Sequence, residues 1–248
     1  MPQSMIIQFS SSQTVPAVSV RGGEDLALAL SILRIPIGRP AISLVGGAAG
    51  LDRPEFTEVR MRMRPLLLEL FRFAVERGAV LIDGGTFSGV MRLAGEARAA
   101  TTAEVHLVGV APSGLVTWPG KPRSADAAPL DANHTAFMLV EGDRWGVESD
   151  VLAALPFIIA NKSVPLEIVV NGGAVTRHDV RSFVAQGGTV LTWGGTGRFA
   201  DDLAAAVLDG RSEDSELSAL LNTGRIYRFD IQQPVEVLNR ILNHLLPV

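Results

Sequence analysis

Four apolar segments of the chain end in paired glycines, a residue type that leaves the backbone open to a ligand. The segments read LVGG at 44–47, IDGG at 82–85, VVNGG at 169–173 and TWGG at 192–195. Glycine allows backbone N–H groups to approach an anion closely, and the N-terminus of a following helix attracts negative charge. One such turn is equally well explained by chain geometry, but four of them together predict an anion-binding rim.

The last of these turns carries an arginine that suits a phosphate. The segment WGGTGRFADDLA at 193–204 places Arg198 directly after Gly197, at the start of a predicted helix. A guanidinium there can hold a phosphate through two hydrogen bonds beside the helix N-terminus. The alternative is an exposed helix arginine that pairs with Asp201 or Asp202.

Three further side chains near the turns each have two interpretations. Thr86 or Ser88 can donate a hydroxyl to the same anion, or either can cap the helix that is predicted to start near Phe87. Trp145, in the polar turn EGDRWGVESD, is placed either to stack on a flat base or sugar or to anchor its loop.

Few residues are candidates for acid–base or metal chemistry. Glu96 is the one carboxylate on an otherwise apolar helix face, where it can orient the glycine loops or serve as an acid or base. Glu148 and Asp150 begin a helix, where acidic side chains are ordinary. His134 ends a long loop and either faces the crevice or bonds to the loop backbone. No HxH or HExxH spacing occurs among the histidines, so no metal site is predicted.

Three common motifs are absent from the sequence. The run GGTFSG at 84–89 lacks the spacing of the dinucleotide fingerprint, no glycine precedes a Lys-Ser or Lys-Thr pair, and no GxSxG elbow occurs. A standard nicotinamide dehydrogenase, a P-loop ATPase and an α/β-hydrolase are therefore disfavoured.

The glycine turns connect short apolar runs to longer segments with helical periodicity. From about Ala41, the runs AISLVGG, AVLIDGG, VHLVGVAP, HTAFMLVEG, PLEIVVNGG and TVLTWGG alternate with such segments. Because these runs are nearly continuous in apolar residues, they predict parallel strands covered by helices on both faces. The expected fold class is α/β, a Rossmann-like three-layer sandwich with a mostly parallel central sheet.

Both ends of the chain are expected to extend this sheet. MIIQF and AVSV predict a short hairpin before a helix, and a helix, the strand RIYRF and a final helix close the chain. Residues 115–133, rich in Pro, Gly, Ala and Asp, predict a long loop. We expect a single domain over 1–248, with a core at about 5–208 and a helix-strand-helix extension at 209–248.

Composition narrows the environment and the partners. The 248 residues carry a net charge of −4, which gives no bulk attraction to nucleic acid. The chain has no cysteine, which excludes disulfides and thiolate chemistry and fits a cytoplasmic location. Neither a signal peptide nor a membrane span is predicted.

The ordered set of turns resembles one superfamily of nucleotide-binding Rossmann-like domains, known as SLOG. The likeness is to the prokaryotic branch (LSDAT type) that is related to the N-terminal homology region of melastatin-type transient receptor potential channels. The motifs that carry it are AISLVGGAAG, GAVLIDGGTFSGVMRLAGEA, VHLVGVAPSGLV, HTAFMLVEGDRWGVE, VVNGGAVTRHDV and GGTGRFADDLA. The resemblance covers about 5–208 and leaves the residues after about 209 outside.

The resemblance implies a binding or sensor domain for a nucleotide-derived ligand such as ADP-ribose. Matched by position, Arg198 would hold phosphate, and Trp145 would replace a family tyrosine near the ligand. A family arginine that contacts the ligand falls near Leu152 here. No cofactor is expected beyond the ligand, and the chain looks like a stand-alone version of the sensor module. The expected ligand-binding residues are Gly46, Gly47, Gly84, Gly85, Thr86, Ser88, Gly89, Val90, Trp145, Gly172, Gly173, Gly194, Gly195, Thr196, Gly197 and Arg198.

Two alternatives remain open. A second SLOG branch contains phosphoribohydrolases with a Pro-Gly-Gly-x-Gly-Thr-x-x-Glu motif, which corresponds here to residues 193–201. Arg198 stands for the threonine and Asp201 for the glutamate, so an N-glycosidase would use Asp201 or Glu96 as its working carboxylate. The other alternative is an interaction protein without ligand, in which the helix VEVLNRILNHLL mediates self-association into a homo-oligomer.

Overall fold

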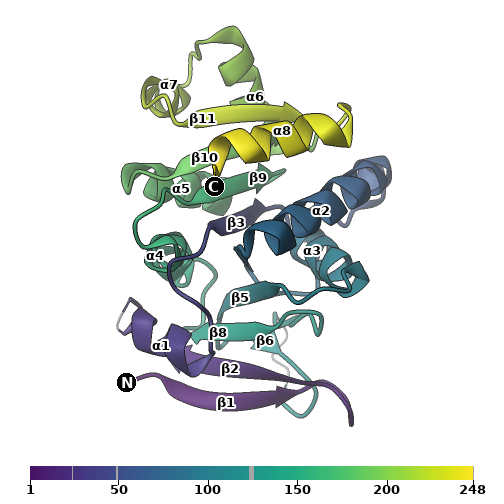
Figure 1. The fold of residues 1–248 in the computed structure, drawn as a ribbon, viewed down its shortest axis with the longest axis vertical. Helices are drawn as coiled ribbons and strands as arrows, with labels where there is room; N and C mark the ends of the chain where they lie inside the picture. The colour runs from purple at the N-terminus through teal and green to yellow at the C-terminus, as the bar shows by residue number, and fades with distance from the viewer. Residues whose placement is uncertain (24, 49, 123–125, 248) are drawn as a thin grey trace.

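A nine-stranded sheet forms the centre of the molecule in the computed structural model, which describes residues 1–23, 25–48, 50–122 and 126–247. The strands follow the order β1-β2-β8-β5-β4-β3-β9-β10-β11. Figure 1 shows this order along the long axis of the molecule, from β1 at one end to β11 at the other. The strand bounds are β1 Gln3–Gln8, β2 Thr14–Val20, β3 Ala41–Gly46, β4 Val80–Asp83, β5 His106–Pro112, β8 Ala136–Val140, β9 Leu166–Val170, β10 Thr189–Gly194 and β11 Ile226–Asp230.

Every pairing within this sheet is parallel except that of β1 with β2, which forms the predicted N-terminal hairpin. The six internal apolar runs predicted as strands all form strands, and β11 is the predicted strand RIYRF. The α/β fold with a mostly parallel central sheet is therefore confirmed. Both flanks join the same sheet, as expected, although the prediction of one domain over 1–248 stays a prediction.

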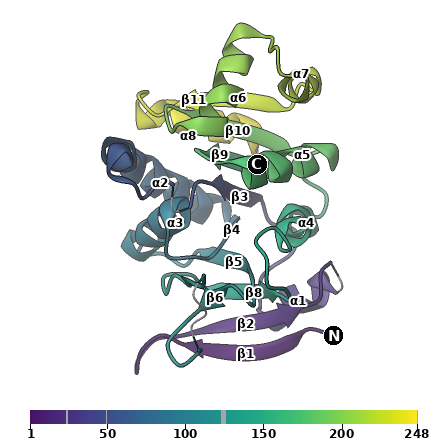
Figure 2. The same ribbon diagram turned by 180° about the vertical axis from the view of Figure 1, so that it is seen from behind.

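Helices cover both faces of the sheet and make it the middle of three layers (Figure 1, and from behind in Figure 2). One face packs on α1, α4, α5, α6 and α7 through Leu30, Leu155 and Phe183, among other residues. The opposite face packs on α2, α3 and α8 through Phe71, Leu93 and Leu242. The helix bounds are α1 Leu26–Ile32, α2 Thr57–Arg77, α3 Gly89–Ala100, α4 Ser149–Ala160, α5 Ala174–Ala185, α6 Arg198–Asp209, α7 Ser215–Asn222 and α8 Val235–Leu245.

The segment predicted as a long loop contains two short paired strands, β6 (Val116–Thr117) and β7 (Ala128–Pro129). Residues 123–125 lie outside the described part of the chain. The segment also reaches the glycine turn after β4, since the amide of Phe87 donates to the carbonyl of Pro129 at 2.7 Å. Thr86 forms an isolated bridge with Leu130. These contacts fasten the segment to the carboxyl end of β4.

The strand order reverses between β3 and β9. From β3 the chain proceeds outward through β4, β5 and β8, and then crosses back through α4 to β9 on the other side of β3. In open parallel sheets such a switch point opens a crevice beyond the carboxyl ends of the strands. The fold therefore places the expected binding region at the ends of β3, β4 and β9.

Candidate ligand-binding site

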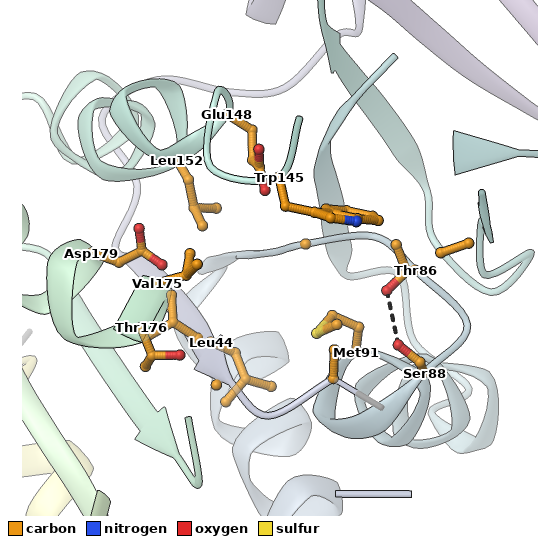
Figure 3. Close-up of a pocket in the computed structure, with 15 residues that line it drawn as sticks. Leu44, Thr86, Ser88, Met91, Trp145, Glu148, Leu152, Val175, Thr176 and Asp179 are labelled. Carbon is orange, nitrogen blue, oxygen red and sulfur yellow. Dashed lines mark hydrogen bonds between the residues drawn. The ribbon is translucent and has the colours of Figure 1, made fainter. Parts of the chain in front are cut away.

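A cavity of about 370 Å³ lies at this switch point. Its lining comes from the ends of β3 and β4, β7, the start of α3, the turn before α4, the first turn of α4 and the first two turns of α5. Figure 3 shows Thr86, Ser88 and Met91 on one side and Leu152, Val175 and Asp179 on the other. The lining residues are Leu44, Val45, Gly46, Ala48, Gly84, Thr86, Ser88, Met91, Ala128, Trp145, Glu148, Leu152, Val175, Thr176 and Asp179.

Five of the expected ligand-binding residues line the cavity, namely Gly46, Gly84, Thr86, Ser88 and Trp145. Trp145 is 47% exposed, and in Figure 3 its ring extends from the α4 side toward Thr86. Ser88 holds the N-cap position of α3, but its hydroxyl lies 3.2 Å from that of Thr86 and caps no helix amide among the described residues. Both residues line the cavity, with their hydroxyls directed at each other.

The other expected residues, except Val90 in the first turn of α3, lie in four turns around the cavity. We term these turns the glycine corners: 46–47, 84–89, 171–173 and 194–198. Several glycines there permit close approach between turns. A Cβ on Gly46 would lie 1.8 Å from the carbonyl oxygen of Val170, and one on Gly89 would lie 2.0 Å from that of Gly47. The amide of Val90 donates to the same carbonyl of Gly47. Much of the glycine pattern is thus required by packing between turns.

The backbone amide at the start of α3 already donates a hydrogen bond to a carboxylate of the chain, that of Asp52. The amide of Gly89 donates to Asp52 at 2.7 Å, and Arg92 donates to the other oxygen of Asp52 at 2.7 Å. Glu96 accepts from Arg92 at 2.7 Å and pairs with Arg64 at 3.0 Å. Glu96 therefore touches the glycine corner through Arg92 and Asp52, and it is not among the residues that line the cavity.

A buried group of charges holds the corner after β4. Nε2 of His134 lies 2.7 Å from Asp83, and its Nδ1 lies 3.3 Å from Asp131. The amide of Gly85 donates to Asp83 at 2.7 Å, and the carbonyl of Gly85 accepts from the amide of Asp131 at 2.9 Å. Burial alone would lower the pKa of His134, but Asp83 and Asp131 raise it to about 9. His134 is fully buried, so it holds the corner from behind and does not face the crevice.

The two corners after β9 and β10 are held by uncharged groups and one carboxylate. The amide of Asn171 donates to the hydroxyl of Thr196 at 2.8 Å, and its side-chain amide donates to the Thr196 carbonyl at 2.7 Å. Asp201 accepts from the amides of Gly195 at 2.7 Å and Thr196 at 3.1 Å. Its carboxylate therefore secures the turn, and Asp201 does not line the cavity.

Arg198 lies outside the cavity, on the surface of the corner that carries it. It is exposed and has a positive φ of 56°. A Cβ on Gly173 would lie 2.6 Å from Nη2 of Arg198, and one on Gly50 would lie 3.2 Å from Nη1. The guanidinium thus rests between the turns that follow β3 and β9, where it can reach an anion that extends beyond the cavity.

The side of the cavity formed by Glu148, Leu152, Val175, Thr176 and Asp179 is termed here the inner wall. Neither Glu148, which the sequence predicts as an ordinary first-turn residue, nor Asp179 is among the ligand-binding residues predicted from the sequence. Burial raises the pKa of both carboxylates. Leu152 lies on this wall, near the position at which the related channels have a ligand-contacting arginine, so the wall has no cation at that position.

A sequence signal for the inner wall did exist. On the apolar side of α5, Asp179 follows Thr176 and precedes Val180 and Phe183, all four of which are buried. A carboxylate on the buried face of an amphipathic helix is uncommon and indicates either a partner or a function. The glutamate inside the strand run LEIVV, Glu167, is a second signal of the same kind.

Neither a metal-binding group nor a membrane-spanning helix is found among the described residues. Within the described ranges, no three His, Asp or Glu side chains form a group that could hold a metal ion. No described helix combines the length and the apolar character needed to cross a bilayer.

Comparison with known proteins agrees with the motifs and the fold. The family model described as "SLOG in TRPM, prokaryote" matches residues 39–239, which include 31 residues beyond about 208 that the motifs left outside the resemblance. The match begins after the N-terminal hairpin and α1.

Related proteins and structures extend this result. The mouse transient receptor potential cation channel subfamily M member 2 is 26% identical over a stretch covering 66% of this chain and 13% of the channel. The rat protein is 25% identical with the same coverage, so the chain spans 13% of the length of these curated relatives. The crystal structure of TM1055, a structural-genomics target, superposes with a TM-score of 0.52 at 18% identity, over 81% of this chain and 99% of TM1055. On the strength of the family match, the chain belongs to the prokaryotic family of SLOG domains related to those of TRPM channels.

Proposed function

We propose that this chain binds a nucleotide-derived ligand, such as ADP-ribose or a relative, as a binding or sensor domain. The observation that carries the proposal is the cavity at the switch point between β3 and β9, with an exposed tryptophan beside it. Ligands of open parallel sheets bind at such points. A volume of about 370 Å³ lies within the range of small-molecule sites.

The cavity lining suits the parts of a nucleotide. Trp145 offers an aromatic face to a base or sugar, and the hydroxyls of Thr86 and Ser88 can donate to a ribose or phosphate oxygen. Arg198 would hold a phosphate that extends outward past Gly173. Membership of a SLOG family supports the same ligand class.

The proposal is tested by calorimetric titration of ADP-ribose, cyclic ADP-ribose, NAD and AMP into the wild-type protein and into Trp145→Ala. Loss of one stacked base costs about 1–3 kcal/mol, so Trp145→Ala should weaken binding by about fivefold or more. Tyr227→Ala is the matched control, because Tyr227 is also an exposed aromatic residue but lies on β11 at the sheet edge. Absence of binding for all four compounds at millimolar concentration would refute the proposed function.

Hydrolysis of an N-glycosidic bond is the second candidate function. It is favoured by one observation, that the carboxylates of Glu148 and Asp179 line the cavity and that burial raises the pKa of each. Such a shift keeps a carboxyl group protonated closer to neutral pH, as a general acid requires. In this arrangement Glu148 replaces Asp201 and Glu96 as the first residue to examine.

Chromatography of AMP and NAD after prolonged incubation with the protein tests this activity. Release of free adenine or nicotinamide by the wild-type protein, lost in Glu148→Gln and retained in Asp201→Asn, is the expected result for such an enzyme. Recovery of AMP and NAD intact after incubation would refute the proposed hydrolase activity.

A further inference from the structure

Three polar side chains lie together behind the cavity, on the α4 and α5 side of the sheet. Glu167 of β9 pairs in register with Ser43 of β3, so both side chains project from the same face. The next inward residues along these strands, Val45 and Val169, belong to the core on that face. Asp179, on the helix that follows β9, completes the group and lines the cavity.

These side chains are buried without full hydrogen bonding. Asp179 is 6% exposed and Glu167 is 1% exposed. Among the described residues, Oδ1 of Asp179, Oε1 of Glu167 and Oγ of Ser43 have no hydrogen-bond partner. A buried acceptor without a donor is costly, and native chains retain few of them. Asp179 is therefore a buried acceptor available to a group that enters the cavity.

The charges around the cavity are arranged asymmetrically. Of the described residues that line it, only Glu148 and Asp179 are charged, and both are acidic. No ion pair joins Glu148, Glu167 or Asp179 to a cation within the described part of the chain. Two neighbours favour the ionised form of Asp179, a hydrogen bond with Ser149 and the exposed His178, but burial outweighs them and raises its pKa. Arg198, which belongs to the glycine corner 194–198, is exposed and does not line the cavity. An anion is thus favoured beside Arg198 and disfavoured at the inner wall.

We propose that the inner wall binds the non-phosphate end of the ligand, by accepting hydrogen bonds from a neutral donor at Asp179, and that it excludes a phosphate at that end. The donor is a ribose hydroxyl or the exocyclic amine of a base, since both are short, neutral donor groups. The inference rests on the proposed function and deepens it, because it gives the ligand an orientation, with phosphate outward and nucleoside inward. Ligands that carry phosphate at both ends of the nucleoside are excluded.

Calorimetric titration of matched mononucleotides tests the orientation. Adenosine 3′,5′-bisphosphate should bind the wild-type protein at least tenfold more weakly than AMP, and Asp179→Asn should reduce that discrimination severalfold. Weaker binding of 2′-deoxy-AMP assigns the donor to the ribose, and weaker binding of IMP assigns it to the base amine. Equal binding of AMP and the bisphosphate, or equal binding of AMP, 2′-deoxy-AMP and IMP, would overturn the inference.

A second measurement does not depend on nucleotide binding. Because the cost of burying the Asp179 carboxylate outweighs its hydrogen bond with Ser149, Asp179→Asn should raise the urea midpoint of the ligand-free protein, whereas the exposed control Asp150→Asn should leave it unchanged. A lower midpoint for Asp179→Asn would show a structural carboxylate and overturn the inference. If no nucleotide binds but the urea midpoint of Asp179→Asn rises, the proposed function is refuted. The inner wall would then still accept hydrogen bonds from a ligand, but from one of another chemical class.

Discussion

Buried carboxylates occur both at the glycine corners and at the inner wall of one cavity, but their surroundings differ. At the corners, the buried Asp83 and Asp131 flank the imidazole of His134, and the partly exposed Asp201 accepts from two backbone amides. At the inner wall and behind it, Asp179 and Glu167 pair with no cation among the described residues. A carboxylate that is compensated within the chain maintains the fold, whereas an uncompensated one is available to a ligand.

Removal of the buried imidazole should have the largest effect on stability. His134→Gln leaves Asp83 and Asp131 buried without their cation, and the free energy of unfolding should fall by about 3–5 kcal/mol. Urea denaturation at pH 6 measures the change. His106→Gln is the control, because that partly buried histidine has no such pair, and it should cost no more than about 1 kcal/mol. Equal losses for the two variants would contradict the assigned role of His134.

The stabilisation by His134 should depend on pH in a defined window. The folded-state pKa of about 9 lies above the ordinary value of 6.5, so the stabilisation is complete below pH 6.5 and is lost as the pH rises toward 9. The stability gap between wild type and His134→Gln should narrow over that window by on the order of 3 kcal/mol. Taking the difference cancels the contribution of the inner-wall carboxylates. If the difference in unfolding free energy between wild type and His134→Gln stays constant between pH 6 and pH 10, His134 is uncharged in the folded protein.

An alanine at the start of α3 should separate the two corners that Gly89 brings together. Gly89 has a φ of +52°, and a Cβ there would lie 2.0 Å from a backbone carbonyl, so Gly89→Ala should cost about 3 kcal/mol. Gly38→Ala tests the φ effect alone, because Gly38 has a φ of +79° and open space, and it should cost about 1 kcal/mol. Thermal or urea unfolding measures both losses of unfolding free energy. Similar losses for the two variants would mean that the two corners can move apart at little energetic cost.

The corner after β10 should show a smaller loss. Asp201→Ala removes the acceptor of the Gly195 and Thr196 amides and should lower the unfolding free energy by about 2 kcal/mol. The adjacent Asp202→Ala removes an exposed carboxylate and should change it by less than about 0.5 kcal/mol. If Asp201→Ala leaves the unfolding free energy unchanged, Asp201 has no structural role, and the catalytic role suggested by its motif would be the remaining explanation.

The smallest effect is expected behind the inner wall. Burial raises the pKa of Glu167 well above its ordinary value and so favours the neutral carboxyl, which glutamine resembles; Glu167→Gln should therefore change stability by less than about 1 kcal/mol. Asp83→Asn, at an equally buried position, removes a charge that His134 needs and should cost about 3 kcal/mol. Urea denaturation at pH 5 compares the two, and a large loss for Glu167→Gln would mean that the wall is held as firmly as the corners.

Local pattern was sufficient for the strands and for the type of sheet. The runs that end in LVGG and IDGG are apolar over the length of a strand and stop at glycine. Strand formation in such runs depends on residues close in sequence, so the pattern alone predicts it. The N-terminal hairpin and β11 were likewise found from short-range pattern. The two short strands in residues 115–133 were missed, because two-residue strands have no periodicity and depend on the turns that they contact.

The sequence by itself determined the parallel sheet, the glycine turns at its carboxyl edge, the family, and Trp145 as a candidate for the cavity. Only the tertiary structure decided that Asp52 takes the amide of Gly89, that Arg198 lies outside the cavity, and that Asp179 and Glu148 form its inner wall. The reason is physical. Strand and turn propensities act between residues close in sequence, whereas the compensation of a buried charge depends on groups from distant segments, which meet only in the folded chain.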